Sequence, residues 1–386
     1  MREIRLGRRA VGPGRCTLSV PLMDIQAQYQ PLRAEIDAAI GAVLDSGRFI
    51  LGPEVSALES DVSQRLQGRP CVGVGNGTDA LVIGLQALDV GPGDEVITTP
   101  YTFYATAEAI ARLGAVPVFV DIDPQTATID PDAIEDAVTE KTKAIIPVDI
   151  FGHPADMTPI LTVAAENGLS VIEDAAQSFG AADNEWAVGT VGDIVTFSFF
   201  PTKNFPGIGD GGMVVARDET LAERVRRLRF HGSKDKVTFE EVGFNSRLDE
   251  LQATVIRLFL PHLDRWNDGR RHAADRYREA GLGQHMTLPV ERPGARHVYH
   301  LYVARHPERD AIRERLSAAG IGAAVYYGIP MHLQPVFAHL GYRKGQLPVA
   351  EEHASTGLAL PMHPHLTDAQ VDEVVAAVGD AVGSIG

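Results

Sequence analysis

Cysteine is scarce in this chain: Cys16 and Cys71 are the only two among 386 residues. At most one pair could form, so a disulfide framework of the kind that holds small secreted domains together is excluded. Neither cysteine stands in a spacing typical of metal ligands, and no metal site is predicted. Such cysteine usage is typical of a reducing compartment, so we expect the protein to be cytoplasmic.

Long apolar runs are missing as well. Stretches such as 144–148 are interrupted by proline or charge well before the roughly 20 apolar residues that a membrane-spanning helix needs. Basic residues are outnumbered, 35 against 51 acidic ones, and the net charge of −16 repels nucleic acid and phosphorylated ligands at long range. We therefore expect neither a membrane nor a nucleic acid as partner, and any phosphate site must be built from local groups.

The chain is long enough for two domains, since single domains usually run to about 100–200 residues. Residues 1–20 carry five arginines and one acid without the apolar core of a signal peptide, so they are predicted to be a loose extension. Near Pro261 the pattern changes to arginine-rich helix. We therefore expect a large domain over 21–265 and a small domain over 266–386.

Short β-branched runs alternate with amphipathic segments through the first part of the chain. The predicted strands cover 96–98, 116–120, 144–148, 170–172, 195–197 and 212–215, and the predicted helices cover 78–88, 103–113, 131–138 and 156–167. Alternation at this period is typical of crossover connections between parallel strands. The predicted class is α/β, with a mostly parallel sheet that helices cover on both faces.

The C-terminal part has a different pattern, which predicts a smaller α+β unit. Its predicted strands cover 299–304 and 323–327, and its predicted helices cover 308–319 and 368–382. Gly320 is expected to end the first of these helices. Thr367 and Gln370 are expected to form a capping box at the start of the second.

A glycine-rich turn, Gly73-Val-Gly-Asn-Gly-Thr-Asp79, opens onto the first predicted helix. Backbone N–H groups and the helix dipole at such a turn can bind phosphate, and Thr78 adds a hydroxyl. The dinucleotide fingerprint requires glycine or alanine where this chain has Thr78, so that fingerprint is absent. Taken alone, the turn is as typical of a plain tight connection as of a phosphate site.

Two further motifs place an acid and an amine after predicted strands. Val171-Ile-Glu-Asp-Ala-Ala-Gln177 brings Asp174 to the carboxyl edge of the sheet, where open parallel sheets bind ligands. Phe197-Ser-Phe-Phe-Pro-Thr-Lys-Asn204 presents a single lysine, Lys203. A lone acid is more often a helix cap, and a lone lysine is nearly always solvated. Together with the glycine-rich turn, however, they supply the anion, the amine and the phosphate cradle that pyridoxal phosphate requires.

At this point the chain resembles the DegT/StrS family of sugar aminotransferases, which share the aspartate-aminotransferase fold (fold type I). The likeness runs from Pro21 to Leu366 through five motifs in order: Gly77-Thr-Asp-Ala80, Gly91-Pro-Gly-Asp-Glu-Val96, Glu173-Asp-Ala-Ala-Gln177, Ser198-Phe-Phe-Pro-Thr-Lys-Asn204 and Asn245-Ser-Arg-Leu-Asp249. The resemblance implies pyridoxal phosphate held covalently on Lys203, with pyridoxamine phosphate as the intermediate form. It also implies transfer of an amino group from an amino acid, usually L-glutamate, to a keto sugar linked to a nucleoside diphosphate.

The resemblance also implies a role for each residue around the cofactor. Lys203 and Asp174 would be the catalytic residues, with Asp174 paired to the pyridine nitrogen. Gln177 would contact the ring hydroxyl, and Phe103 would stack on the ring face. The residues implied for the phosphate are Gly77, Thr78, Ser198 and Asn245 of the partner subunit.

A phosphate ligand from the partner subunit implies a homodimer with shared active sites. Polar residues expected to face the sugar are Arg247, Tyr326 and His332, although His332 could equally be a satisfied loop histidine. The run Gly209-Asp-Gly-Gly212 resembles the form found in relatives that aminate C3, whereas relatives that act on C4 often carry Thr-Gly-Glu-Gly-Gly. A 3-keto sugar is therefore the favoured substrate, and a 4-keto sugar is the alternative.

Two segments depart from the family pattern. Asp149-Ile-Phe-Gly-His153 stands where relatives usually have His-Leu-Tyr-Gly-Gln, and Phe205-Pro-Gly-Ile208 replaces a run of the Leu-Gly-Ala type. Two other classes of protein stay open beside the aminotransferase. One is a regulatory protein of the same fold that binds pyridoxal phosphate without turnover. The other is a sugar dehydratase, against which Lys203 counts because such relatives have histidine in its place.

Overall fold

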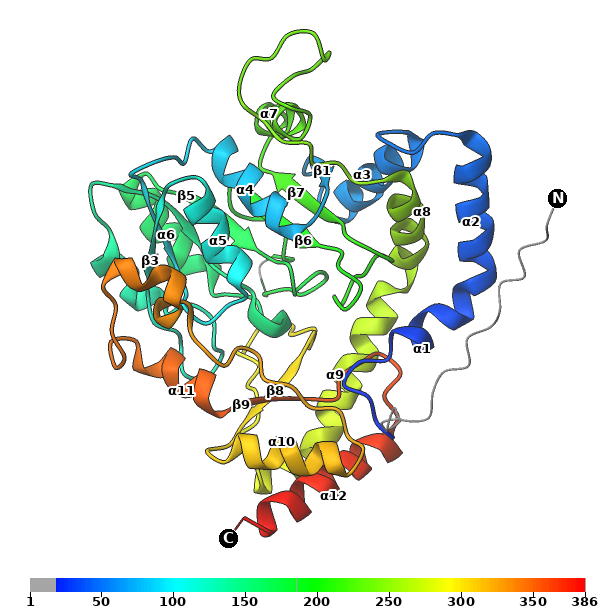
Figure 1. The fold of residues 1–386 in the computed structure, drawn as a ribbon, viewed down its shortest axis with the longest axis vertical. Helices are drawn as coiled ribbons and strands as arrows, with labels where there is room; N and C mark the ends of the chain where they lie inside the picture. The colour runs from blue at the N-terminus through cyan, green and yellow to red at the C-terminus, as the bar shows by residue number, and fades with distance from the viewer. Residues whose placement is uncertain (1–18, 185, 386) are drawn as a thin grey trace, which may run out of the picture.

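The computed structural model describes residues 19–184 and 186–385 (Figure 1). Most of the predicted N-terminal extension, with Cys16, lies outside these residues. Val20 is fully buried and pairs with Ile321, so the folded part of the chain has begun by this residue. No helix within the described ranges combines the length and apolar character needed to cross a membrane.

The larger sheet has seven strands in the order β1-β7-β6-β5-β4-β2-β3. Their bounds are β1 Cys71–Val74, β2 Glu95–Thr98, β3 Val116–Phe119, β4 Thr142–Ile146, β5 Ser170–Asp174, β6 Ile194–Ser198 and β7 Gly212–Ala216. β7 runs antiparallel to both of its neighbours, and the remaining pairs are parallel. The predicted α/β class with a mostly parallel sheet is confirmed. The carboxyl ends of β1, β5 and β6 therefore meet at one edge, where β7 begins.

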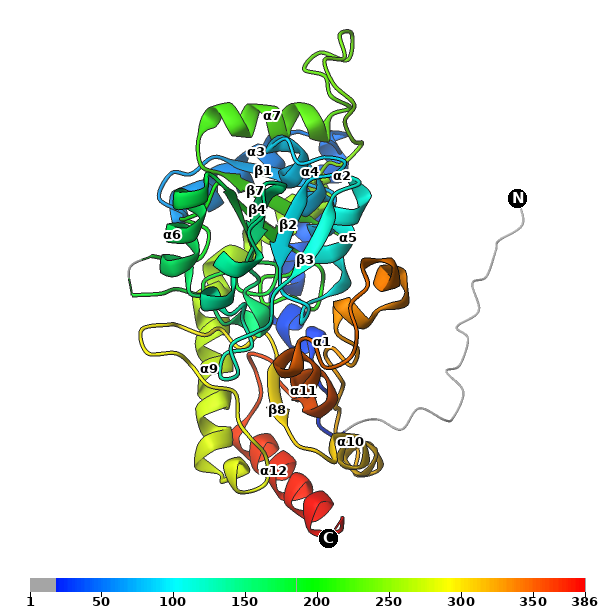
Figure 2. The same cartoon turned by 90° about the vertical axis from the view of Figure 1, so that its left-hand side faces the viewer.

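Helices cover both faces of this sheet because successive strand residues point to opposite sides (Figures 1 and 2). Cys71 packs on one face and Val72 on the other. One face carries α4 (Gly77–Ala87), α5 (Tyr104–Arg112) and α7 (Glu219–Arg229). The opposite face carries α3 (Pro53–Arg65), α6 (Met157–Asn167) and α8 (Glu250–Phe259). The N-terminal helices α1 (Ile25–Tyr29) and α2 (Arg33–Ser46) follow on the outside of α8.

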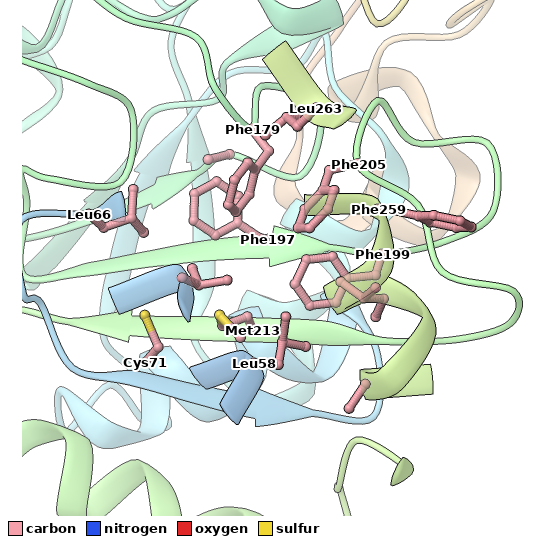
Figure 3. Packing of buried hydrophobic residues seen from close by; sticks show 14 of the residues in the cluster. Leu58, Leu66, Cys71, Phe179, Phe197, Phe199, Phe205, Met213, Phe259 and Leu263 are labelled. Carbon is pink, nitrogen blue, oxygen red and sulfur yellow. The ribbon is translucent and has the colours of Figure 1, made fainter. Parts of the chain in front are cut away.

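A group of phenylalanines packs together on one face of the sheet, near the end of β6 (Figure 3). The ring of Phe179 lies 4.5 Å from that of Phe197 and 4.6 Å from that of Phe205, centroid to centroid. Phe199 meets Phe205 edge to face at 5.4 Å. Aromatic pairs in these geometries add to the stability gained from area burial alone. The segment that carries Lys203 therefore starts and ends in rigid, fully packed side chains.

The C-terminal part is smaller and packs below the sheet in Figure 1. It contains α9 (Leu263–Glu279), β8 (Tyr302–Arg305), α10 (Arg309–Ala318), α11 (Pro348–Thr356), β9 (Gly357–Leu360) and α12 (Asp368–Gly383). The capping box of Thr367 and Gln370 is confirmed at the start of α12. Helix α9 runs without interruption across position 265, so the division into 21–265 and 266–386 stays a prediction.

Two predicted elements are wrong. Residues 131–138 form two short 3-10 turns, Pro131–Ala133 and Glu135–Ala137, because Val138 takes extended backbone before an α-helix can develop. Residues 323–327 do not form a strand. Only Ala324 bridges to Ala359 of β9, and the two following tyrosines turn towards a cavity instead.

Candidate active site

A cavity of about 370 Å³ opens at the carboxyl edge of the large sheet, against the C-terminal part. It brings together eight of the residues that the sequence singled out: Gly77, Thr78, Phe103, Asp174, Gln177, Ser198, Lys203 and Tyr326. These residues come from four strand ends and from a loop of the C-terminal part. The topology of the sheet, and not nearness in sequence, assembles the site.

The glycine-rich turn forms the first wall of the cavity. Asn76 caps α4 by accepting the N–H of Asp79 at 2.8 Å, so Gly77 and Thr78 are the first two residues of the helix. N–H groups in a first helical turn have no acceptor inside the helix, which favours an anion there. A side chain at Gly77 would meet the Cβ of Ser198 at 2.7 Å, and one at Gly212 would meet the carbonyl oxygen of Asn76 at 2.4 Å. Glycine is required at both positions for the turn to close on the end of β6.

Asp174 lies at the end of β5 and is 6% exposed. It accepts a hydrogen bond from the hydroxyl of Thr106 at 2.8 Å and one from the N–H of Ala176 at 3.3 Å. Burial raises the pKa of this carboxyl group, while those two hydrogen bonds and the charge of Lys203 oppose the rise. A positive group bound in the cavity would lower the pKa again and hold Asp174 as an anion.

Lys203 follows β6 in a tight turn, with its N–H donating to the carbonyl of Phe200 at 2.8 Å. Burial lowers the pKa of the Lys203 amine to about 8, and the charge of Asp174 partly offsets this. A lysine with a lowered pKa has more free amine near neutral pH, which is the form that attacks a carbonyl carbon. In the described chain the two groups interact through space without a hydrogen bond between them.

Gln177 and Phe103 also line the cavity. The side-chain carbonyl of Gln177 accepts the N–H of Phe151 at 2.8 Å, and its amide donates to the hydroxyl of Tyr327 at 3.2 Å. Phe103 is 52% exposed, and its ring lies 6.0 Å from the ring of Tyr327. Phe103 thus presents a free ring face at the mouth of the cavity, whereas Gln177 is fixed in place by its neighbours.

Three predicted site residues do not line the cavity. Asn245 is exposed and Arg247 is half-buried, and both lie in the segment that follows the loop projecting beyond α7 (Figure 1). His332 is 1% exposed, and its Nε2 lies 3.1 Å from Glu351. Its surroundings match the alternative of a loop histidine with an internal partner. The sugar-facing role predicted for His332 has no support from this arrangement.

The sequence analysis missed several residues that line the cavity, notably Thr106, His300 and Tyr327. The spacing of Thr102 and Thr106, four residues apart, could have indicated Thr106, because residues at this spacing lie close together at a helix start. The two hydroxyls are indeed 2.9 Å apart. Tyr327 is adjacent to the predicted Tyr326. His300 carried no signal in the sequence, because its place depends on how the C-terminal part packs against the sheet.

The residues present fit pyridoxal phosphate. The cofactor needs an amine for its aldehyde, an anion for its ring nitrogen and a cradle for its phosphate. Lys203, Asp174 and the α4 turn face one cavity, and a side chain at Gly77 or Gly212 would fill the cradle. Among the described residues, no cluster of acids, histidines and cysteine has the arrangement of a metal site.

The sheet order, the cavity and its lysine and acid define an aminotransferase of fold type I. The chain belongs to the DegT/DnrJ/EryC1/StrS aminotransferase family, whose profile matches residues 30–379. It is 51% identical to a "Pleiotropic regulatory protein" of Geobacillus stearothermophilus, over 94% of this chain and 98% of the relative. It is 46% identical to a UDP-N-acetyl-3-dehydro-alpha-D-glucosamine 3-aminotransferase of Acidithiobacillus ferrooxidans, over 93% and 97% of the two chains.

A solved structure agrees with these relatives. The crystal structure of DesV from S. venezuelae, in complex with a ketimine intermediate, matches with a TM-score of 0.91 and 44% identity. The match covers 94% of this chain and 98% of DesV. The resemblance inferred from the motifs is therefore confirmed at the level of family and fold.

Proposed function

We propose that this enzyme moves an amino group from L-glutamate to C3 of a keto sugar carried by a nucleoside diphosphate, with pyridoxal phosphate bound on Lys203. The observation that carries the proposal is the meeting of Lys203, Asp174 and the α4 turn in one cavity at the sheet edge. The family supports the cofactor, and a solved neighbour holds its pyridoxamine form. Pyridoxamine phosphate is the form of the cofactor that carries the amino group from the first half-reaction to the second.

Each residue has a task in this reaction. When bound, the cofactor supplies an electron sink for the carbanion that forms at the donor's α-carbon. The carboxylate of Asp174 would hold a proton on the pyridine nitrogen, and the hydroxyl of Thr106 donates to Asp174 and keeps it in place. With the cofactor bound, the amine of Lys203 would carry the proton from the α-carbon of the donor to C4′ of the cofactor. Its pKa of about 8 suits both steps near neutral pH.

The substrate class rests on the relatives and on one motif. The Acidithiobacillus relative is named for amination at C3 of a UDP-linked 3-keto sugar, and DesV shares the fold and 44% of the sequence. The run Gly209-Asp-Gly-Gly212 resembles the C3 form, and Asp210 and Gly211 line the cavity. A 4-keto sugar is the alternative acceptor.

We further propose a homodimer in which Asn245 of one protomer reaches the phosphate in its partner. Asn245 is exposed and does not line the cavity of its own chain. The loop before it carries exposed apolar side chains, with Val237 80% and Val242 87% exposed. Such side chains are expected to be covered when a second protomer packs against this loop.

Covalent labelling tests the proposal. The purified protein should be yellow, and borohydride should fix the cofactor on the peptide that contains Lys203, with no label after Lys203→Ala. Addition of L-glutamate should convert the cofactor to its amine form, and a screen of UDP- and dTDP-linked keto sugars should reverse the change. Label on Lys234 or Lys236 instead of Lys203 would contradict the assignment.

A regulatory protein without turnover is the second candidate. The name of the Geobacillus relative favours it, at 51% identity. The glutamate half-reaction separates the two candidates, because a regulator that binds the cofactor without turnover leaves its spectrum unchanged on adding glutamate.

A further inference from the structure

Arg270 of α9 is a buried charge that has no acidic partner among residues 19–184 and 186–385. It is 3% exposed, and among the described residues its two hydrogen-bond acceptors are the carbonyls of His300 at 3.5 Å and Met362 at 3.3 Å. Its Nε is buried without a hydrogen-bond partner. Burial lowers the pKa of Arg270 to about 10, which still leaves the guanidinium charged at neutral pH. A buried charge of this kind costs free energy unless an anion comes close.

His300 touches both Arg270 and the catalytic cavity, since its backbone carbonyl accepts from Arg270 and the residue lines the cavity. Lys203 lines the same cavity, while His300 is only 4% exposed and its Nδ1 is buried without a hydrogen-bond partner among the described residues. Burial, together with the charges of Lys203 and Arg270 and the neighbouring His297, holds the pKa of His300 well below its usual value. His300 is therefore a neutral imidazole in a region of positive potential. Such a region favours an anion within the cavity.

The chemistry of the two substrates indicates which anion this is. An amino-acid donor carries its carboxylate on the carbon that holds the amino group, so this charge must lie inside the cavity. The ring of a keto sugar is neutral near its ketone and offers hydroxyl groups. A neutral imidazole can donate a hydrogen bond to the carboxylate of the donor or to a hydroxyl group of the sugar. An arginine that faced the cavity would be left without an anionic partner whenever the sugar is bound.

We propose that His300, supported by the charge of Arg270 behind it, forms the subsite for the α-carboxylate of the amino-acid donor. This inference rests on the proposed function and adds the residues that recognise the donor. His300 contacts the carboxylate, and Arg270 acts through His300 as a positioning residue. The alternative is that Arg270 only ties α9 to the segment around Met362.

Two small reagents separate the subsite from the cofactor chemistry. Aminooxyacetate and O-methylhydroxylamine attack the cofactor with the same aminooxy group, but only the first has a carboxylate. Each reagent changes the absorbance of the holoenzyme at a measurable rate, and the ratio of the two rates gives the preference for the carboxylate. His300→Leu should lower this preference about tenfold or more, because a charge-assisted hydrogen bond is lost. His300→Asn should restore part of it, and Arg270→Gln should lower it as well.

A second measurement does not depend on the loaded cofactor. Glutarate, a dicarboxylate without an amino group, should raise the Tm of the cofactor-free wild-type protein and should not raise that of His300→Leu. His363→Gln is the matched control, since His363 is equally buried near Arg270 but does not line the cavity. This control should keep both the preference and the Tm shift.

The outcomes distinguish a failure of the carboxylate subsite from a failure of the proposed function. An unchanged reagent preference in a folded His300→Leu protein, with the glutarate shift retained, overturns the subsite and leaves the proposed function standing. Absence of any spectral change with either reagent overturns the proposed function, and the glutarate shift then decides on the subsite alone. If Arg270→Gln does not fold, the His300 variants still decide.

Discussion

Glu173 and Asp149 are two fully buried acids on the side of β5 opposite Asp174. Asp149 accepts hydrogen bonds from the N–H of Ala155 and the hydroxyl of Ser178, each at 2.8 Å. Glu173 accepts the N–H of Gly189 at 3.2 Å through one carboxyl oxygen, and its other oxygen is buried without such a donor. Burial and the nearby Asp149 raise the pKa of Glu173 well above its usual value. A protonated Glu173 that donates to Asp149 satisfies both groups.

This pair predicts a pH dependence of stability. A carboxyl group whose pKa is raised on folding stabilises the native state below its unfolded pKa, and that contribution is lost as the pH rises through the folded value. The contribution of Glu173 to stability should therefore fall as the pH rises above the ordinary glutamate pKa, because each pH unit between the unfolded and folded pKa values removes about 1.4 kcal/mol of stability. Glu173→Gln, which cannot ionise, should flatten this fall in a series of thermal melts. A slope that is the same in Glu173→Gln would show that Glu173 is not the proton carrier.

Asp174 lies on the catalytic side of the same strand and predicts a loss of activity. Asp174→Ala should leave the cofactor able to bind but slow the glutamate half-reaction by about 10²–10³-fold, the usual cost of removing one preorganised electrostatic group. Rapid-mixing absorbance measurements give this rate directly. Asp174→Asn keeps the size of the side chain and an acceptor for Thr106, so it tests the loss of charge alone. Its glutamate half-reaction should be nearly as slow as that of Asp174→Ala. A wild-type rate in the alanine variant would make Asp174 a structural cap.

Helix α3 begins at a buried carboxylate from a distant part of the chain. Glu250, the first residue of α8, accepts the N–H groups of Gly52 and Glu54 at 2.8 Å and of Val55 at 2.9 Å. The side chain is 1% exposed and serves as the missing N-cap, since Gly52 has no side chain to cap with. The carboxylate also favours the positive end of the α3 dipole.

Glu250→Ala should therefore destabilise the protein strongly. Three N–H groups, of which that of Val55 is buried and the other two are part-buried, would lose a charged acceptor. We expect a loss of about 2–3 kcal/mol in the free energy of unfolding, measured by urea titration. Glu35→Ala is the control, because Glu35 also lies in the first turn of a helix but is exposed. The control should change the free energy by less than about 0.5 kcal/mol. Equal effects of the two substitutions would contradict the capping role.

The elements that sequence periodicity predicted well are those with a clear local pattern. Strands β2, β4, β5, β6 and β7 and helices α4, α6, α10 and α12 lie within a few residues of their predicted positions. β1 was missed because it is only four residues long and Gly73 interrupts its apolar run. The segment 323–327 has the composition of a strand, but its single available neighbour, β9, is short and accepts only Ala324.

The residues of the candidate site also fall into those that a local motif indicates and those that only tertiary packing brings to the cavity. Lys203, Asp174 and Gly77 stand in motifs whose local geometry puts them at strand ends, so the sequence indicated them together. Tyr327 and His300 reach the cavity only through the packing of the C-terminal part on the sheet. No local pattern encodes that packing, so their roles could not have been predicted.

At the scale of the whole molecule, the shared-site proposal predicts complementation between two inactive variants. Lys203→Ala removes the amine from its own site, and Asn245→Asp sets a carboxylate against the phosphate in the partner's site. In a mixed dimer both defects fall on one site and leave the other intact, so random reassortment should recover roughly a quarter of wild-type activity. The assay mixes the two proteins under conditions of subunit exchange, and mixed dimers are verified by mass spectrometry. Verified exchange without recovery would reject the shared site.

The position of β7 in the sheet has a consequence for how the protein is made. β1 carries the glycine-rich turn, but within the larger sheet its one neighbour is β7, with Cys71 paired to Val215. During synthesis the turn leaves the ribosome long before the strand that supports it exists, and non-local strand pairs of this kind form slowly. A growing chain that ends before β7 exposes β1 as an unpaired edge and cannot hold a phosphate. The glycine-rich turn therefore has its supporting strand only after more than half of the chain, through β7, has been translated.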